Sequence, residues 1–361
     1  MTQRMIAACV SVPLLLGLIA VAVFVPVPFA SYHPGPTFDV LGETDGEEII
    51  QVSGAKTYRD DGEIRMTTVS VSQEGVEKNL FEVMGDWVDP DSAVYPYDIV
   101  HPPGTTAEQE EIEGQVQMVS SQGNAIAAAL RELDYDVEPA LEVLSIAPTT
   151  PADGALAVRD IFVSVDGVAL TADEKGQQTL LDAVKNAEDG QKLSFVVLRD
   201  GKEVTVPVGT QEVTDPDGTK RRQIGIQLGL GFVFPFTVSV KISDNIGGPS
   251  AGLMFALAIY DTLTPGSLTG GQDVAGTGEL DGQGVVGAIG GIQQKVAGAR
   301  EAGADLFLVP EGNCPDALRA DNGDMRLVRA TTFVETLRAV EDWAEDPDAE
   351  LPSCEDVEEA A

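Results

Sequence analysis

The sequence is poor in basic residues, in histidine and in cysteine. Lysine and arginine together number 22 against 59 aspartates and glutamates, which gives a formal net charge of −37. This balance argues against a nucleic-acid-binding protein and against electrostatic attraction to an anionic membrane surface. No G-x-x-x-x-G-K-[ST] segment occurs, so the motifs indicate no Walker A nucleotide site. We expect neither a metal nor another cofactor.

A serine lies in a run of small residues, 247–252, directly before the apolar segment 253–260. Glycine lets the backbone approach a substrate closely, and Pro249 suits the first position of a helix because it has no N–H group to satisfy. Ser250 is therefore expected at or near a helix N-terminus, where free N–H groups favour a developing oxyanion. The same residues also fit an ordinary helix start without chemistry, since serine is a common capping residue.

The scarcity of histidine limits the bases that could activate this serine. Residues 248–252 fit the G-x-S-x-G elbow of α/β-hydrolases, whose histidine follows the serine in the chain. Both histidines of this sequence, His33 and His101, precede Ser250, so that order is excluded. An order with the histidine first stays open. However, His33 follows an apolar run and His101 precedes a Pro-Pro-Gly segment, so we expect both to be solvated.

The remaining candidate base is a lysine in a helical pattern between residues 289 and 300. Apolar residues recur there at helical spacing: Ile289, Ile292, Val296 and Ala299. Lys295 lies on or beside this stripe, whereas Arg300 lies off it. Burial would lower the pKa of the lysine toward neutrality, as a general base requires. The alternative is a lysine whose stem packs on the stripe while its ammonium reaches water.

Several short motifs resemble, in their order and spacing, the proteolytic domain of the Lon endopeptidases. They are Gly-Pro-Ser-Ala-Gly at 248–252, Gly-Thr-Gly-Glu-Leu at 276–280, the segment 286–295, and Ala-Gly-Ala-Asp followed by an apolar strand at 302–310. The resemblance implies a catalytic dyad of Ser250 as nucleophile and Lys295 as base. It also implies that Thr277 hydrogen-bonds the lysine.

The same resemblance gives roles to the neighbours of the serine and implies an assembly. Gly248, Pro249 and Ala251 would be the supporting residues of the serine loop, and the domain would form a homo-oligomeric, often hexameric, ring. The sequence departs from the family at Gly247, where Lon enzymes usually carry aspartate. This departure leaves open how the serine loop becomes active.

The segment from Val137 to about Thr210 resembles the PDZ domains of bacterial proteases. The residues that carry this resemblance lie at 143–146, 151–156, 160–167 and 195–201. A PDZ domain binds an extended peptide as an added strand and often recognises a C-terminal carboxylate. Arg159 stands where a glycine is expected. The Gly-Leu-Gly-Phe run at 229–232 spells a PDZ loop signature but follows the pattern, so we interpret it as leading into a strand at 237–242.

The N-terminus differs from the rest of the chain because residues 5–25 are almost all apolar, preceded by Arg4. About 20 apolar residues suffice for a bilayer span, and a cleaved signal peptide is the alternative. A basic residue on the short side predicts a cytoplasmic N-terminus. We therefore expect a single-pass protein of the cell membrane, held in the lipid bilayer by this helix, with its other domains outside the cytoplasm.

The cysteines agree with an oxidising compartment. Cys9 lies within the apolar segment, whereas Cys314 and Cys354 lie in polar, proline-containing segments beyond it. Such a pair predicts a disulfide that ties the C-terminal tail to the body. Two free thiols are the alternative.

These observations predict an α+β protein in several parts. The expected parts are an anchor at 1–30, an extracytoplasmic segment at 31–135, a PDZ domain at 136–212, a Lon-type proteolytic domain at 224–344 and an acidic tail at 345–361, mobile except at Cys354. Within the second part we expect strands at 49–52 and 64–71, a loop at 87–104 and a helix at 108–133. The Lon resemblance implies that segments near 62–71 and 117–133 begin the proteolytic domain. The PDZ domain would then be an insertion in it.

The sequence thus predicts an ATP-independent, membrane-anchored serine endopeptidase. Its substrates would be peptides or unfolded proteins, with the PDZ domain presenting unfolded or C-terminal segments. The alternative is a catalytically inactive PDZ and Lon-fold scaffold that binds envelope proteins.

Overall fold

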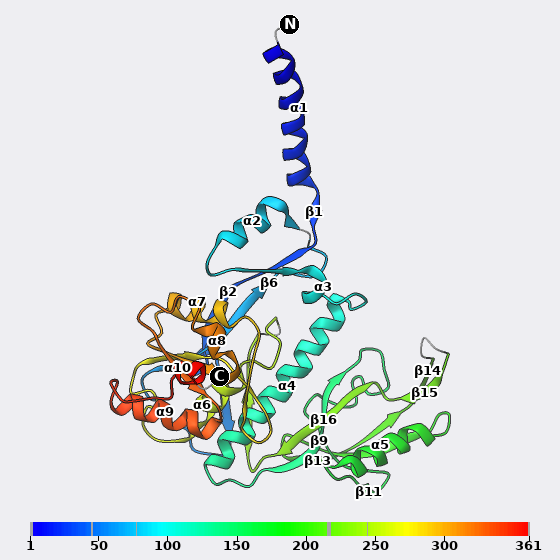
Figure 1. Ribbon diagram of the computed structural model, residues 1–361. Coiled ribbons are helices and arrows are strands. Elements are labelled where there is room, and N and C mark those ends of the chain that lie inside the picture. Colours follow the sequence, from blue (N-terminus) through cyan, green and yellow to red (C-terminus); the bar gives the residue numbers. More distant parts are fainter. Residues whose placement is uncertain (1–2, 45, 77, 215–217, 244, 360–361) are drawn as a thin grey trace.

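The computed structural model describes residues 3–44, 46–76, 78–214, 218–243 and 245–359. It begins with an apolar helix, α1 (Gln3–Phe24), which stands away from the body of the molecule (Figure 1). Its mean hydropathy reaches 2.7 and no part of that stretch is buried. Length and composition therefore make α1 a candidate membrane span.

A six-stranded sheet forms the centre of the body, in the order β22-β21-β18-β6-β2-β8. Its strands are β2 (Phe29–Asp39), β6 (Glu63–Val71), β8 (Ala93–Pro96), β18 (Asp273–Gly276), β21 (Leu306–Pro310) and β22 (Arg326–Ala330). Strands β6, β18, β21 and β22 run parallel, β2 pairs antiparallel with β6, and β8 pairs antiparallel with β2. The chain before residue 135 therefore shares this sheet with segments that follow residue 272.

Helices cover both faces of this sheet because its buried strands are apolar on both sides. Leu306 and Leu308 face a core shared with helices α4 (Ala107–Glu132), α6 (Gly252–Leu263) and α9 (Phe333–Glu345). Phe307 and Val309 point to the opposite face, toward α7 (Ile292–Ala302) and α8 (Cys314–Ala317). The result is a three-layer unit in which α4 packs against α6.

A second sheet lies beside α4 and has a core of its own, built around Phe162 and Phe195 (Figure 1). Its order is β13-β12-β10-β9-β16, with β11 on β10. The strands are β9 (Glu138–Ile146), β10 (Ile161–Val165), β11 (Val168–Ala169), β12 (Lys192–Arg199), β13 (Lys202–Gly209) and β16 (Ile226–Val233), and helix α5 spans Glu174–Asn186. The hairpin β14 (Gln211–Thr214) and β15 (Lys220–Gln223) separates β13 from β16.

The Gly-Leu-Gly-Phe run is the first point at which the structure corrects the sequence interpretation. Residues 229–232 lie inside β16, which pairs with β9 along its length, so the expected boundary at 224 is wrong. A glycine fits this strand because a Cβ at Gly231 would lie 2.1 Å from Oε2 of Glu142. The strand that leads to the serine is a separate one, β17 (Thr237–Val240), paired with β5 (Ile50–Ser53).

The segment 87–104, expected to be a loop, contains regular structure. Helix α2 (Leu80–Val88) ends in it, and it supplies β8 and a short helix, α3 (Tyr97–Val100). His101, expected to be solvated, is 7% exposed. Its Nε2 lies 2.8 Å from the carbonyl oxygen of Ser72 and its Nδ1 3.1 Å from Glu110 Oε1. Strand pairing with β2 orders this proline- and aspartate-rich segment.

The acidic tail, as far as Glu359, is held on the body and does not match the mobile segment expected from the sequence. The N–H of Arg329 in β22 donates to the carbonyl of Pro352, and Ser353 bridges to Val328. Cys314 and Cys354 form a disulfide, and helix α10 (Glu355–Glu359) follows it. The remaining short elements are β1 (Pro26–Val27), β3 (Glu43–Thr44), β4 (Glu47–Glu48), β7 (Lys78–Asn79), β19 (Glu279–Leu280), β20 (Val286–Gly287) and a 3₁₀ turn (Glu311–Asn313).

Candidate functional site

Three side chains meet at the carboxyl end of β18. Thr277 directly follows this strand, Ser250 precedes α6, and Lys295 lies in the first turn of α7. Helices α6 and α7 pack on opposite faces of the sheet, so the serine and the lysine approach each other around the strand end. The sequence predicted these three residues, which lie far apart in the chain, and the structure brings them together.

The contacts among them form a continuous hydrogen-bonded set. Lys295 Nζ lies 2.8 Å from Ser250 Oγ and 2.9 Å from Thr277 Oγ1. The Thr277 hydroxyl donates to the carbonyl oxygen of Ser250 at 2.9 Å, and the N–H of Gly278 donates to the same oxygen at 2.8 Å. Because the threonine proton is directed to that carbonyl, Thr277 Oγ1 must accept its hydrogen bond from the lysine.

Burial sets the charge state of the lysine. Lys295 is 3% exposed, and desolvation lowers its pKa from 10.5 to about 7. Within the described residues no carboxylate pairs with it to oppose this shift. A neutral amine that donates one N–H to Thr277 can direct its lone pair at Ser250 Oγ, which is the geometry of a base beside its nucleophile.

Helix α4 holds the supporting residues of the serine loop. Gly248, at φ +92°, donates its N–H to the carbonyl of Gly114 at 2.9 Å. The Ser121 hydroxyl donates to the carbonyl of Pro249 at 2.9 Å. These contacts hold the serine loop on α4 and outside helix α6. Helix α6 begins at Gly252 with Ala251 as its N-cap, so the expected helix start at Pro249 is wrong.

The backbone N–H groups next to the nucleophile are free to bind a ligand. Those of Ser250 and Ala251 make no hydrogen bond within the described part of the chain. They lie ahead of the N-terminus of α6, whose dipole favours negative charge. A carbonyl oxygen that becomes negative during attack by Ser250 would find its donors there.

Packing against α4 also explains Gly247, the departure from the Lon pattern. A Cβ on Gly247 would lie 3.1 Å from the Cα and 3.2 Å from the carbonyl carbon of Gly114. An aspartate side chain would therefore crowd the helix backbone. Sequence reasoning did not assign Gly114 or Ser121 to the site, although Ser121 lies in the segment 117–133 that the Lon resemblance places at the start of the proteolytic domain.

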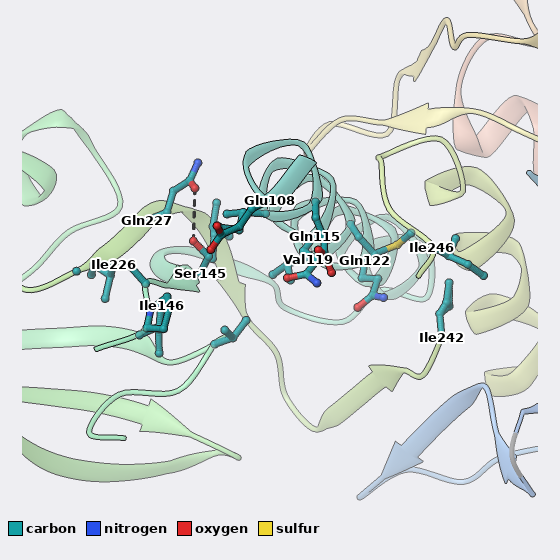
Figure 2. Close-up of a pocket in the computed structure, with 18 of the residues that line it drawn as sticks. Glu108, Gln115, Val119, Gln122, Ser145, Ile146, Ile226, Gln227, Ile242 and Ile246 are labelled. Carbon is teal, nitrogen blue, oxygen red and sulfur yellow. Dashed lines mark hydrogen bonds between the residues drawn. The ribbon is translucent and has the colours of Figure 1, made fainter. Parts of the chain in front are cut away.

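A cleft of about 830 Å³ lies between α4, the second sheet and the segment before the serine loop. Figure 2 shows its apolar walls, with Ile146 and Ile226 on the sheet side, Val119 on α4, and Ile242 and Ile246 on the serine side. Ser250 does not line the cleft, but Ile246 shortly precedes it in the chain. The cleft is thus a surface next to the serine loop and not the dyad itself.

The second sheet carries a smaller groove of about 310 Å³ between β16 and the start of α5, lined in part by Leu141, Leu228 and Leu230. In the described chain β16 pairs only with β9, so its outer edge is open. Arg159, where glycine was expected, has φ +72°, a conformation that favours glycine. Its guanidinium donates to Gln122 Oε1 of α4 at 2.5 Å and so joins the sheet to the helix.

Residues 244–338 match the model of the Lon protease (S16) C-terminal proteolytic domain. The chain contains a Lon proteolytic domain. Residues 115–210 match the PDZ model, so a PDZ domain is present as well. That match starts within α4, which packs on the proteolytic unit, and ends before β16, which the structure places in the PDZ sheet.

Curated relatives that are Lon proteases match limited stretches of this chain. Lon protease of Fusobacterium nucleatum is 37% identical over 99 residues, 26% of this chain and 12% of the relative. Lon protease 2 of Herpetosiphon aurantiacus is 38% identical over 81 residues, 22% of this chain and 10% of the relative. The chain thus spans about a tenth of the length of these relatives. Among solved structures, the PDZ domain of an SdrC-like protein from Listeria monocytogenes covers 25% of this chain and 86% of its own, at 21% identity and TM-score 0.21.

Proposed function

We propose that the protein is an ATP-independent Lon-like serine endopeptidase that uses a Ser250–Lys295 dyad and is anchored in the membrane by α1. One observation carries the proposal: a buried lysine whose pKa is lowered to about 7 lies 2.8 Å from the hydroxyl of a serine. The Walker A motif is lacking, so no nucleotide step is included. The resemblance to Lon enzymes supports a ring of several copies. The apolar helix α1 supports a topology in which the other domains lie outside the cytoplasm.

The reaction follows from the hydrogen bonds. Ser250 Oγ attacks the carbonyl carbon of a peptide bond while neutral Lys295 accepts the hydroxyl proton. The N–H groups of Ser250 and Ala251 stabilise the oxyanion of the tetrahedral intermediate. Lys295, now an ammonium, donates that proton to the leaving amine, and an acyl-enzyme remains on Ser250. Water, deprotonated by Lys295, attacks the acyl carbon and releases the acid product and free Ser250.

The surroundings of the dyad support an extended substrate. The cleft of Figure 2 offers apolar walls beside the serine loop, and the open edge of β16 can pair with a peptide strand. A polypeptide held by the PDZ sheet at one point would present flexible neighbouring residues to Ser250. Substrates are therefore unfolded proteins or peptides, because nothing in the proposed mechanism unfolds a stable domain.

The test is cleavage of a fluorescently labelled unfolded protein by the full chain in detergent, without ATP. We expect cleavage by the wild type and its loss in Ser250→Ala and in Lys295→Ala. The exposed residues Ser194 and Lys202 of the PDZ sheet serve as matched controls, and their alanine variants should retain full activity. Activity that survives Ser250→Ala would contradict the dyad. Binding of peptides without cleavage by any form would favour an inactive scaffold instead.

A further inference from the structure

Helix α2 (Leu80–Val88) presents its apolar side to solvent. Five exposed apolar side chains of α2 fall, at 100° per residue, within an arc of roughly 120°. They are Leu80, Phe81, Met84, Trp87 and Val88, the last two exposed to 78% each. Val83, which lies outside this arc, is buried. A surface helix of a soluble domain buries this side instead.

Polar contacts fix α2 in this orientation. Asp86, on the inner side, accepts hydrogen bonds from Lys78 Nζ at 2.7 Å and from Ser31 Oγ at 2.5 Å. Asn79 and Glu82 close a capping box at the first turn. The helix cannot turn its apolar side inward without breaking the bonds of Asp86.

The position of α2 identifies what covers the apolar side. Helix α1 ends at Phe24, and the following strand β1 pairs with β7, with Pro26 opposite Asn79. Helix α2 begins at the next residue, and Figure 1 shows it beside the foot of α1. If α1 crosses a bilayer, α2 lies at the level of the lipid headgroups.

We propose that α2 lies in the bilayer interface, with its apolar side, Leu80, Phe81, Met84, Trp87 and Val88, inserted among the lipids. The helix contains no lysine or arginine and carries Glu82 and Asp86. Insertion therefore depends on apolar burial and requires no anionic lipid. The inference rests on the proposed membrane anchor but not on the peptidase activity. A spanning helix and an interfacial helix together would restrict rotation of the catalytic body about α1.

Tryptophan fluorescence tests this directly, because the chain has only two tryptophans. Trp87 is 78% exposed in the described structure, whereas Trp343 is 3% exposed in the core of the proteolytic unit. The full chain carrying Ser250→Ala, which prevents self-cleavage, is reconstituted in phosphatidylcholine vesicles brominated on the acyl chains near the headgroup. The difference between this protein and its Trp87→Phe variant reports Trp87 alone. We expect roughly twofold quenching of Trp87 by the brominated lipid and little quenching by aqueous acrylamide.

A matched control places the probe elsewhere. Val168 is 54% exposed and belongs to β11 of the PDZ domain, which Figure 1 shows at the end of the molecule opposite to α1. Tryptophan introduced there by Val168→Trp on the Trp87→Phe background should be quenched by acrylamide and not by brominated lipid.

The outcomes separate the two proposals. Failure of the protein to float with the vesicles would overturn the anchor, and the position of α2 with it. If the protein floats with the vesicles but Trp87 is quenched by acrylamide and not by brominated lipid, the interfacial position of α2 is overturned and the anchor stands. Protection of Trp87 from both quenchers would also overturn it, because a protein surface, such as a second copy of the chain, would then cover the helix. Dependence of the bromine quenching on added anionic lipid would contradict the apolar mode of insertion.

Discussion

Two buried ionisable groups, one in the proteolytic unit and one in the PDZ sheet, behave differently. Lys295 and Glu142 are 3% and 4% exposed, and desolvation moves both pKa values to about 7, downward for the lysine and upward for the glutamate. Among the described residues, the amine of Lys295 hydrogen-bonds only to the hydroxyls of Ser250 and Thr277. Glu142 faces a cation, with Arg159 at 3.8 Å. A shifted pKa therefore indicates a catalytic base only where a nucleophile lies within hydrogen-bond reach.

The surroundings of Glu142 point to a structural role. Its carboxylate lies between Gly231 of β16 and Gly123 of α4, with Oε2 about 4.0 Å from the position of a Cβ on Gly123. Arg159, beside it, hydrogen-bonds Gln122, the neighbour of the Ser121 that supports the serine loop. The glutamate thus belongs to the joint between the PDZ sheet and the proteolytic unit.

The largest expected effect is on catalysis, through replacement of Lys295. Lys295→Met and Lys295→Arg should each lower the cleavage rate on the order of 10⁴-fold, since methionine cannot accept a proton and arginine is never deprotonated. Lys295→Met should also stabilise the fold below pH 7, by up to about 5 kcal/mol, because a desolvated amine no longer has to be buried. Peptidase assays and chemical denaturation measure the two effects. An active arginine variant would show that positive charge, and not the base, is required.

The pH dependence of the wild type comes next in size. The folded pKa of Lys295, about 7, lies below its ordinary 10.5, so the neutral base is present above pH 7. We expect kcat/KM to fall about tenfold per pH unit below 7 and to be level above 8. In the same protein the lysine should make stability rise with pH between about 7 and 10.5, where the unfolded chain binds the extra proton. A rate that is independent of pH between 5 and 8 would contradict a lysine base.

The contrast between the two groups also shows what the sequence could predict. Ser250, Thr277 and Lys295 belong to local motifs with fixed spacing, whereas the helical stripe around Lys295 fitted both a buried amine and an ammonium that reaches water. Glu142 gave no such signal, and Arg159 stood out only as a departure from glycine, because their environment is formed by α4 and β16, both outside the segment 137–210 that resembles a PDZ domain. The same holds for Gly114 and Ser121, which touch the serine loop only through tertiary packing. Local pattern also missed β8, whose proline-rich sequence is ordered by pairing with β2.

Removal of the Glu142 carboxylate should change the stability of the fold and leave the peptidase reaction unchanged. The folded pKa of Glu142, about 7, exceeds its ordinary 4.5. The folded state therefore loses stability as the pH rises from about 4.5 to about 7, where only the unfolded chain has released the proton. Glu142→Gln should be more stable than the wild type at pH 8, by up to about 3 kcal/mol, and equal to it near pH 4.

Thermal unfolding of both proteins at pH 4, 6 and 8 measures this difference, and Glu138→Gln, at an exposed position of the same strand, is the matched control. The peptidase pH profile of Glu142→Gln should match that of the wild type. A displaced profile would mean that Glu142 influences the Ser250–Lys295 dyad. Glu142 would then not be a purely structural group.

The smallest expected effect concerns Thr277, the neutral partner that distinguishes the lysine from the glutamate. Thr277→Val keeps the shape but removes the hydroxyl that accepts from Lys295 and donates to the Ser250 carbonyl. That carbonyl keeps its bond from Gly278 N–H, so the loop should remain in place and the loss in kcat should be roughly ten- to a hundredfold with KM unchanged. Thr277→Ser retains the hydroxyl and should restore most of the rate. Steady-state kinetics of the two variants decides between two roles for Thr277. If Thr277 only filled space, the valine variant would be more active than the serine variant. If Thr277 orients the lone pair of Lys295, the serine variant should be the more active one.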